Sequence, residues 1–299
     1  MAVNYAAGLS GYVDANRLPL IKKLLFAPQS IKYFGLLTGV HGPTNLNILD
    51  TQVTFGAGNT CGWTDGATSE FSARELVPGA IKIQQSICDK AMLDYWNGYA
   101  VKVAAGRKDG NCPFEEDFTD LLKREVAKEL EIAIWQGDTT SASPNLNKFD
   151  GLLTLINNDA TITPIATAND ILVDTYACYN AIAEESLLGT SIYMSIAQFK
   201  ALVLALGNAN LYHYDPKVDE ELTIILPNTQ TKVHGVYGLT GATDIIALAD
   251  EHVIYGVSML EDKDEYKLWY SLDNQEYRIE IDFVAGIQYA FSSEVVIVS

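Results

Sequence analysis

The stretch YRIEIDFVAGIQYAF, residues 277–291, has an apolar side chain at every odd position, with charged side chains between the first of them. A period of two is typical of a β-strand that buries one face. Strands usually end after about five or six residues. A strand of this length would instead cross the whole width, about 50 Å, of a compact domain of this chain length. We expect the structural core of this strand to include Tyr277, Ile279, Ile281 and Phe283.

The composition describes an apolar but acidic chain. Of 299 residues, 48% are hydrophobic, and 38 acidic against 20 basic residues give a formal net charge of −18. This apolar content is enough for a large core and disfavours disorder. Because the surface is acidic, it repels phosphate, which disfavours a sequence-reading nucleic-acid-binding protein unless a local basic patch exists.

Motifs for metal, cofactor or membrane binding are missing from the sequence. The four cysteines and four histidines are scattered and form no CxxC pair, so no zinc site is expected. The string GAGNTCG at 56–62 has no following helix, which favours a glycine-rich loop tip over a nucleotide loop. There is no GxSxG or HExxH motif. No secretory signal and no run of 18 apolar residues are present, so we expect no membrane segment, no cofactor and no catalytic residue.

Paired carboxylates are the remaining enzymatic candidate. Glu129 and Glu131 are two residues apart in a predicted helix, so their side chains point in different directions. We expect both on a charged, solvated face. The acidic run EDKDE at 261–265 lacks the spaced ligands of a calcium loop and predicts a solvated turn.

The clearest helix is PFEEDFTDLLKREVAKELEIAIWQG, residues 113–137. Its apolar residues recur at spacings of three and four, which places them on one stripe. Acidic residues in the first turn suit the positive end of the helix dipole, and Gly137 is expected to end the helix. About 23 residues would make a rod of roughly 34 Å.

Two segments before this helix have little core of their own. Residues 1–48 are rich in Gly and Pro around LPLIKKLLF (18–26), a candidate amphipathic helix, and predict an extended arm. Residues 49–87 predict a long hairpin with a Gly- and Thr-rich tip and a returning strand interrupted by Pro78. Isolated hairpins are marginal in water, so both segments need another surface to lie on.

The rest of the chain mixes helices and short strands. Residues 169–206 predict helix, strand and helix, and short strands follow between 222 and 260. A hairpin then turns at Asp273–Asn274 into the long strand. This order of elements predicts an α+β protein.

The ordered series resembles the major capsid proteins of tailed bacteriophages, which have the HK97-like fold. The matching strings are the helix end KELEIAIWQGD (128–138), FDGLLTLI (149–156) and, most specifically, the stretch from Ile224 to Phe291. The resemblance covers nearly the whole chain. It implies an HK97-like α+β fold with an N-terminal arm (1–48), an extended loop (49–87), a discontinuous peripheral domain (88–166 and 243–299) that holds the long spine helix and long β-strands, and an axial domain (167–242).

The resemblance also implies a function. Such a protein is no enzyme. It assembles with itself into hexamers and pentamers, in the host bacterial cytoplasm, and forms the icosahedral shell of the virion around double-stranded DNA. The extended loop would lie across the adjacent subunit and the arm would run along the shell. The implied inter-subunit contacts are Gly56, Asn59, Trp63, Asp65 and Glu70 at the loop tip, and Tyr12, Arg17 and Leu20 in the arm.

The resemblance further implies partners. They are a portal protein, a scaffolding protein and, in some members, decoration or cement proteins, with no membrane and no sequence-specific DNA binding. Because the arm begins almost at Met1, we expect scaffolding to be a separate protein. The tip from Gly56 to Glu70 holds no lysine, so an isopeptide cross-link is not expected there. The alternatives are an encapsulin-like compartment, a soluble enzyme of unknown chemistry, and a phage decoration or tail protein.

Overall fold

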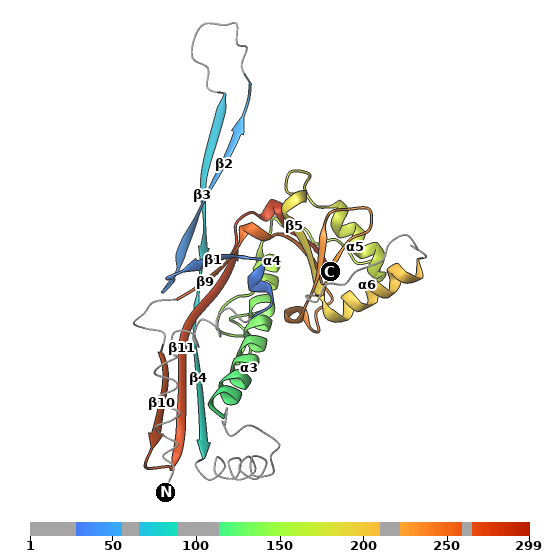
Figure 1. Cartoon of the computed structure of the whole chain (residues 1–299). Helices are drawn as coiled ribbons and strands as arrows, with labels where there is room; N and C mark the ends of the chain where they lie inside the picture. Colours follow the sequence, from blue (N-terminus) through green and yellow to red (C-terminus); the bar gives the residue numbers. More distant parts are fainter. Residues whose placement is uncertain (1–27, 56–65, 89–113, 210–221, 259–264) are drawn as a thin grey trace.

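The computed structural model describes residues 28–55, 66–88, 114–209, 222–258 and 265–299. Within them the chain forms two five-stranded sheets and a separate two-stranded hairpin. The molecule is elongated: the hairpin projects from one end, the long strand runs down the other, and the second sheet lies to one side (Figure 1). Short 3₁₀ helices connect the larger elements: η1 (Ser30–Lys32), η2 (Leu187–Gly189), η3 (Tyr237–Leu239), η4 (Asp250–His252) and η5 (Ser292–Glu294).

The first sheet is built around the long strand. This strand, β11, spans Glu276–Tyr289, and its 14 residues would extend about 46 Å. On one side it pairs antiparallel with β4 over ten residues, from Glu276↔Cys88 to Ala285↔Gly79. On the other side it pairs first with β10 and then with β9, and β1 adds to β9 in parallel. The remaining strands of this sheet are β1 (Gly35–Thr38), β4 (Gly79–Cys88), β9 (Val253–Val257) and β10 (Glu265–Ser271).

The burial of β11 changes along its length. From Tyr277 to Phe283 only the odd positions are buried, as the period of two predicts. From Ala285 onward every residue of the strand is buried. The backbone at Val77–Pro78 covers the second face there, since a Cβ on Gly286 would lie 2.8 Å from Pro78 Cα. The long strand therefore has one buried face in its first half and two in its second.

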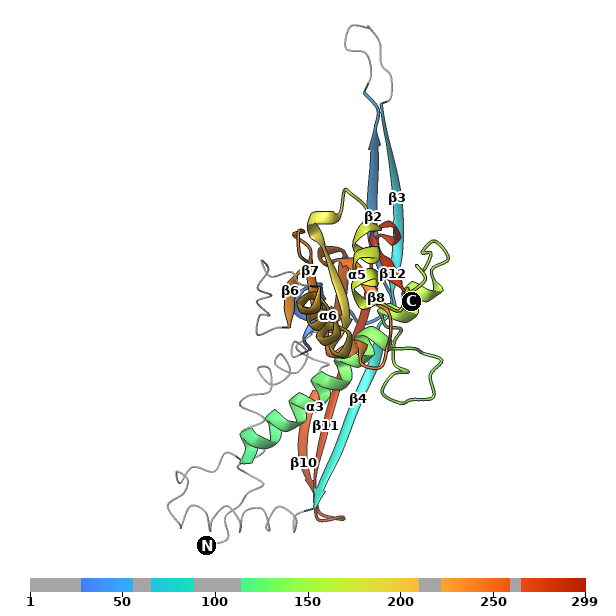
Figure 2. The ribbon, with the colours of Figure 1, turned by 90° about the vertical axis from the view of Figure 1, so that its right-hand side faces the viewer.

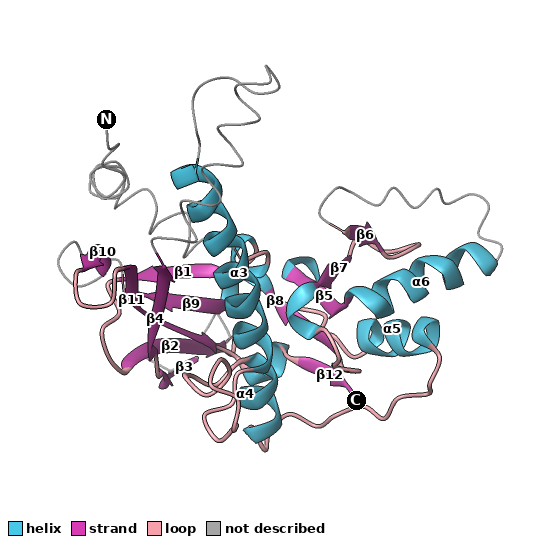
Figure 3. Ribbon diagram, turned by 90° about the horizontal axis from the view of Figure 1, so that it is seen from below, coloured by secondary structure: helices cyan, strands magenta, loops and turns pink. Residues whose placement is uncertain are grey.

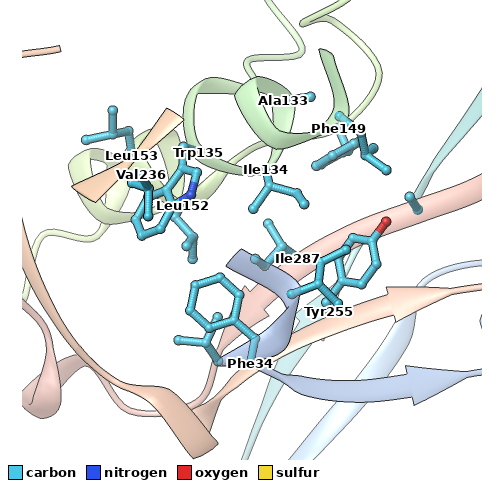
Figure 4. Packing of buried hydrophobic residues seen from close by; sticks show 14 of the residues in the cluster. Phe34, Ala133, Ile134, Trp135, Phe149, Leu152, Leu153, Val236, Tyr255 and Ile287 are labelled. Carbon is cyan, nitrogen blue, oxygen red and sulfur yellow. The ribbon is translucent and has the colours of Figure 1, made fainter. Parts of the chain in front are cut away.

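The predicted helix is confirmed as α3 (Phe114–Gln136), which packs along the first sheet. Figure 4 shows Ile134 and Trp135 on α3 in the same cluster as Phe34, just before β1, and Tyr255 and Ile287 on the strands β9 and β11. All are part of one buried cluster, which also includes α4 (Leu152–Asn158).

Gly137 follows the last helical residue, as predicted. Glycine is needed at this position because the chain packs closely against it. Its amide donates to Ala133 O, and its carbonyl accepts from the Gly151 amide at 2.9 Å. A Cβ on Gly137 would lie 2.5 Å from Phe149 O, and one on Gly151 would lie 2.6 Å from Gly137 N. Two facing glycines thus let the chain beyond α3 return directly against it and begin α4.

The second sheet has the strand order β12–β8–β5–β7–β6. Helices α5 and α6 pack side by side against it (Figure 3). Each begins with a polar cap: Asp170 accepts from the Leu172 amide, and Ser195 forms a reciprocal capping box with Gln198. The strands of this sheet are β5 (Thr190–Ser195), β6 (Thr223–Ile225), β7 (Lys232–Val236), β8 (Ile245–Ala249) and β12 (Val296–Val298), and the two helices are α5 (Ile171–Asn180) and α6 (Ile196–Asn208).

Element boundaries differ from the predicted ones in three places. The end of the predicted arm is part of the body, because Ile31 and Phe34 are buried and β1 joins the first sheet. The hairpin consists of β2 (Thr44–Val53) and β3 (Ala67–Leu76), whereas β4 leaves it to pair with β11. Strand β8 pairs with β5 and β12 pairs with β8, so both belong to the second sheet. The division into peripheral and axial domains stays a prediction, and residues 18–26 lie outside the described chain.

Candidate assembly interface

The β2–β3 hairpin extends beyond the rest of the molecule (Figures 1 and 2). Its strands pair antiparallel over ten residues, from Thr44↔Leu76 to Val53↔Ala67, or about 33 Å. At its base, Leu46 and Leu76 bury their side chains with Val40. Further along β2, Ile48 is also buried, whereas Leu49 and Val53 are exposed. A hairpin of this length is marginally stable alone, so its outer part needs a second surface.

One face of the hairpin carries exposed apolar side chains, which we call the apolar stripe. Leu49 is 58% exposed and lies directly across from Phe71, which is 84% exposed. Val53 lies on the same face four residues further along β2, and it is 62% exposed. Phe55, just past the end of β2, is 95% exposed. Clustered exposed apolar side chains mark sites of protein contact in folded proteins, so the stripe is the strongest candidate interface of the described chain.

A compact polar cluster holds the base of the hairpin, and we call it the hairpin anchor. Arg74 on β3 donates from Nη2 to Asp159 Oδ2 at 2.8 Å, and its guanidinium lies 4.4 Å from the centre of the Tyr289 ring. Asp159 Oδ2 also accepts from Tyr289 Oη and Ser292 Oγ, each at 2.9 Å. Arg74 contacts Ser292 Oγ as well. The anchor thus joins the hairpin, the end of α4, the end of β11 and η5.

The anchor is electrostatically biased toward its charged form. Hydrogen bonds from Thr161 and from Arg74 lower the pKa of the Asp159 carboxyl well below its usual range. Burial raises the pKa of Tyr289 to about 12, so its hydroxyl remains a donor at neutral pH. Asp159 is therefore an anion with Arg74 as its cation, and the pair is mostly shielded, with side chains 13% and 26% exposed.

A second polar cluster holds the segment before β1 against α3. Glu131 accepts from the Ser30 amide at 3.1 Å, and from the Ser30 hydroxyl. Trp135 Nε1 donates to Ser30 Oγ at 2.8 Å and to Glu131 Oε1 at 3.3 Å. Burial raises the pKa of Glu131, although these hydrogen bonds oppose the shift.

The prediction that Glu131 lies on a solvated helix face is therefore wrong, because only 2% of it is exposed. The signal that sequence reasoning missed is local. Ile132, Ala133, Ile134 and Trp135 are consecutive apolar residues, so the last turns of this helix are apolar on all sides and must be buried on all sides.

The predicted site residues fall into three groups. The arm residues Tyr12, Arg17 and Leu20 and the tip residues Gly56, Asn59, Trp63 and Asp65 lie outside the described chain. Glu70 lies on β3 opposite Asp50, and its side chain is not described. The structure buries Tyr277, Ile279, Ile281 and Phe283, and the last three belong to the main core cluster.

Sequence reasoning gave no warning of the apolar stripe or of the hairpin anchor. Alternation in β3 could have indicated the stripe, since Phe71 stands between polar residues in SEFSAREL (69–76). The anchor has no local signal, because Arg74 and Asp159 are 85 positions apart.

The described residues contain no group of three or more His, Cys, Asp or Glu side chains placed to hold a metal ion. A groove of about 280 Å³ between α3 and β4 is lined mainly by apolar side chains, with Lys82, Glu125, Glu129 and Lys148 among its polar residues. No described helix is long and apolar enough to cross a bilayer.

Comparison with known proteins gives matches at the level of structure. No protein-family model matches the sequence, and no curated protein matches it. A chain of the satellite phage P4 procapsid structure, which includes the size determination (Sid) protein, superposes with a TM-score of 0.64 at 9% identity, covering 100% of this chain and 98% of that one. A capsid chain of an empty GTA particle gives 0.60 at 12% identity, covering 90% and 88%.

The chain has the fold of phage capsid proteins. The predicted α+β capsid fold is thereby confirmed over the whole length of the chain. The same capsid fold occurs in the SrpI encapsulin complex from Synechococcus elongatus, which superposes with a TM-score of 0.55 at 11% identity, covering 90% of this chain and 85% of that one. These likenesses establish a fold that is used by shell-forming proteins.

Proposed function

We propose that this protein is the major capsid protein of a tailed bacteriophage. Copies of it associate into hexamers and pentamers that close into an icosahedral shell around double-stranded DNA. Shell formation takes place in the cytoplasm of the bacterial host, and the protein acts as a structural component and not as an enzyme. A portal protein, a separate scaffolding protein and decoration proteins are its proposed partners.

The observation that carries the proposal is the combination of a capsid fold with the apolar stripe on a projecting hairpin. A stripe on one end of a chain that meets a different surface of the next copy makes a heterologous contact, and such contacts close into rings when the rotation permits. Each buried apolar side chain contributes about 1.5–3 kcal/mol. Several weak contacts per subunit then stabilise a closed shell.

The charge of the chain supports a container for DNA. A net charge of −18 gives the surface little attraction for phosphate. A packaged genome must move during filling and release, so a wall that does not hold it is an advantage. The binding of DNA by enclosure requires no sequence-reading site.

An encapsulin-like compartment is the second candidate, and the structural match to the SrpI encapsulin favours it. Both candidates predict closed shells of this one chain. They differ in content, because a phage capsid is filled with DNA through a portal whereas a compartment encloses protein.

The test is assembly of the purified full-length chain, followed by sedimentation and electron microscopy. The proposal predicts closed icosahedral shells, with larger shells when scaffolding and portal proteins of the same phage are co-expressed. Small uniform shells that carry a co-purified protein would favour the compartment. A chain that stays monomeric at every concentration and salt would contradict both.

A further inference from the structure

The hairpin leaves the body through a narrow base. Only its two strands connect the apolar stripe to the first sheet, and β3 passes into β4 through Val77–Pro78. Leu76 is fully buried at this base, and Gln288 Nε2 donates to Glu75 O at 2.9 Å. A small rotation at the base moves the far end of a hairpin of about 33 Å by a large distance. Something at the base must therefore set the direction of the hairpin.

The hairpin anchor is placed to do so. Arg74 lies two residues before the end of β3, where its side chain reaches across the base to Asp159 and the Tyr289 ring. Three bodies meet there: β3, the residue that caps the C-terminus of α4, and the end of β11. A planar guanidinium between a carboxylate and an aromatic ring has a defined orientation.

The anchor is itself rigidly held. Asp159 accepts from the Thr161 amide at 3.0 Å and from the Thr161 hydroxyl at 2.6 Å. Ser292 begins η5, the short connection through which the chain passes from β11 in the first sheet to β12 in the second. The anchor, formed by Arg74, Asp159, Tyr289 and Ser292, therefore joins the hairpin to the junction of the two sheets.

We propose that Arg74 is a positioning residue for assembly, which fixes the direction of the β2–β3 hairpin relative to the body through Asp159 and Tyr289. The inference rests on the proposed shell function for the partner of the hairpin, a second copy of this chain. In the unassembled subunit, the anchor holds the apolar stripe at the angle that the next copy meets. Without it, the hairpin still forms but pivots at its base.

The direct test measures the direction of the hairpin in the unassembled full-length chain. Spin labels are placed on Ser69→Cys in β3 and Lys200→Cys in α6, both exposed, with Cys61, Cys88 and Cys112 changed to serine. Pulsed electron paramagnetic resonance then gives the distribution of label distances. We expect one narrow distribution in the parent chain and a distribution at least about twice as wide in Arg74→Met.

Matched variants separate position from stability. Arg278→Met removes an arginine whose partner is Glu276, at the opposite end of β11, and is expected to leave the distribution narrow. Asp159→Asn should widen it as Arg74→Met does. Arg74→Lys retains the charge and should recover part of the narrow distribution. If Arg74→Met fails to fold by circular dichroism, Asp159→Asn and Arg74→Lys carry the test.

A distribution in Arg74→Met or Asp159→Asn as narrow as that of the parent chain would overturn the inference. Shell formation provides the second readout: Arg74→Met should give shells of mixed diameter or incomplete shells where the parent gives uniform ones. Failure of the parent to form shells would count against the proposed function and leave the distance measurement valid.

Discussion

Glu131 is a buried carboxyl group, and its burial in the fold disfavours the ionised form. Because burial raises its pKa in the folded state, the folded chain binds more protons than the unfolded chain between the two pKa values. The contribution of Glu131 to stability is therefore fully present below its ordinary pKa of 4.5 and is lost as the pH rises through the folded value. Residues 28–34 should be held to α3 most tightly in mild acid.

The prediction concerns a difference between two proteins. The free energy of unfolding of the parent chain minus that of Glu131→Gln should fall as the pH rises from about 4.5 to about 8. Chemical denaturation at several pH values measures it. Lys82→Met, which removes an exposed charge outside this cluster, controls for general effects of charge. A difference that rises with pH, or stays constant, would show that the folded pKa is not raised.

The facing glycines at the end of α3 support a second prediction at this scale. A Cβ on Gly151 would lie within 3 Å of three backbone atoms, Ala133 O, Gly137 N and Ile134 O. Overpacking against backbone costs about 1–3 kcal/mol or more, so Gly151→Ala should lower the free energy of unfolding by at least about 2 kcal/mol.

The matched control is Gly207→Ala, near the end of α6, where a Cβ meets nothing within 4 Å. Alanine is the better helix former by about 0.5–1 kcal/mol, so this variant should be unchanged or slightly more stable. Thermal unfolding compares the two. Equal effects at both glycines would contradict the role given to close packing.

Individual residues could be predicted from the sequence where the signal was periodic. The alternation from Tyr277 to Phe283 correctly indicated which side chains are buried. Contacts between residues far apart in the sequence could not be predicted. Ser30 and Glu131, for example, are 101 positions apart, and neither local sequence indicates the other as its partner. The two polar clusters that tie extensions to the body are both of this kind.

At the scale of elements, the first prediction tests the buried face of the long strand. Phe283 is 4% exposed in the main core. Phe283→Asp removes its packing and buries a carboxylate, so the free energy of unfolding should fall by more than about 5 kcal/mol, which is as large as the whole stability of a marginally stable domain, and the chain should not fold. Ser86→Asp, on the exposed face of β4 opposite Arg278, is the control and should fold normally. Circular dichroism and solubility decide between them, and a folded Phe283→Asp chain would disprove the buried face.

The second prediction at this scale tests the apolar stripe. Phe71→Ser removes an aromatic side chain of the stripe, while Ser72→Ala changes the neighbouring residue on the opposite face. The monomer should melt at the same temperature in both. The concentration needed for shell formation should rise about ten-fold or more only in Phe71→Ser, since about 1.5 kcal/mol of contact is lost per subunit. Light scattering measures it, and an unchanged threshold would exclude the stripe from the interface.

Helices and strands were predicted best where a periodic pattern of apolar residues continued over many residues. The helix from Phe114 to Gln136 and the long strand were both expected from their patterns. The extent of the hairpin was not, because β3 and β4 are equally strand-like and only pairing decides that β4 belongs to β11. Pro78 marks the break between β3 and β4. The sequence alone does not show that this break lies between two different sheets; the strand pairing in the structure does.

For the whole molecule, net charge should govern assembly. Subunits of formal charge −18 repel one another, and salt screens that repulsion over about 8–10 Å at physiological strength. Shell yield at fixed protein concentration should therefore rise as salt increases from about 0.01 M to about 0.15 M. Sedimentation of assembled material measures it. A yield that falls over this range would mean that attractive ion pairs dominate the contacts.

The most direct test of the account is a cryo-electron microscopy map of the particle formed by the purified full-length chain. The account predicts a closed shell in which the β2–β3 hairpin of each copy lies on its neighbour, with Leu49, Val53 and Phe71 buried in that contact. A chain that forms no particle, or a shell in which this stripe faces solvent, would contradict it.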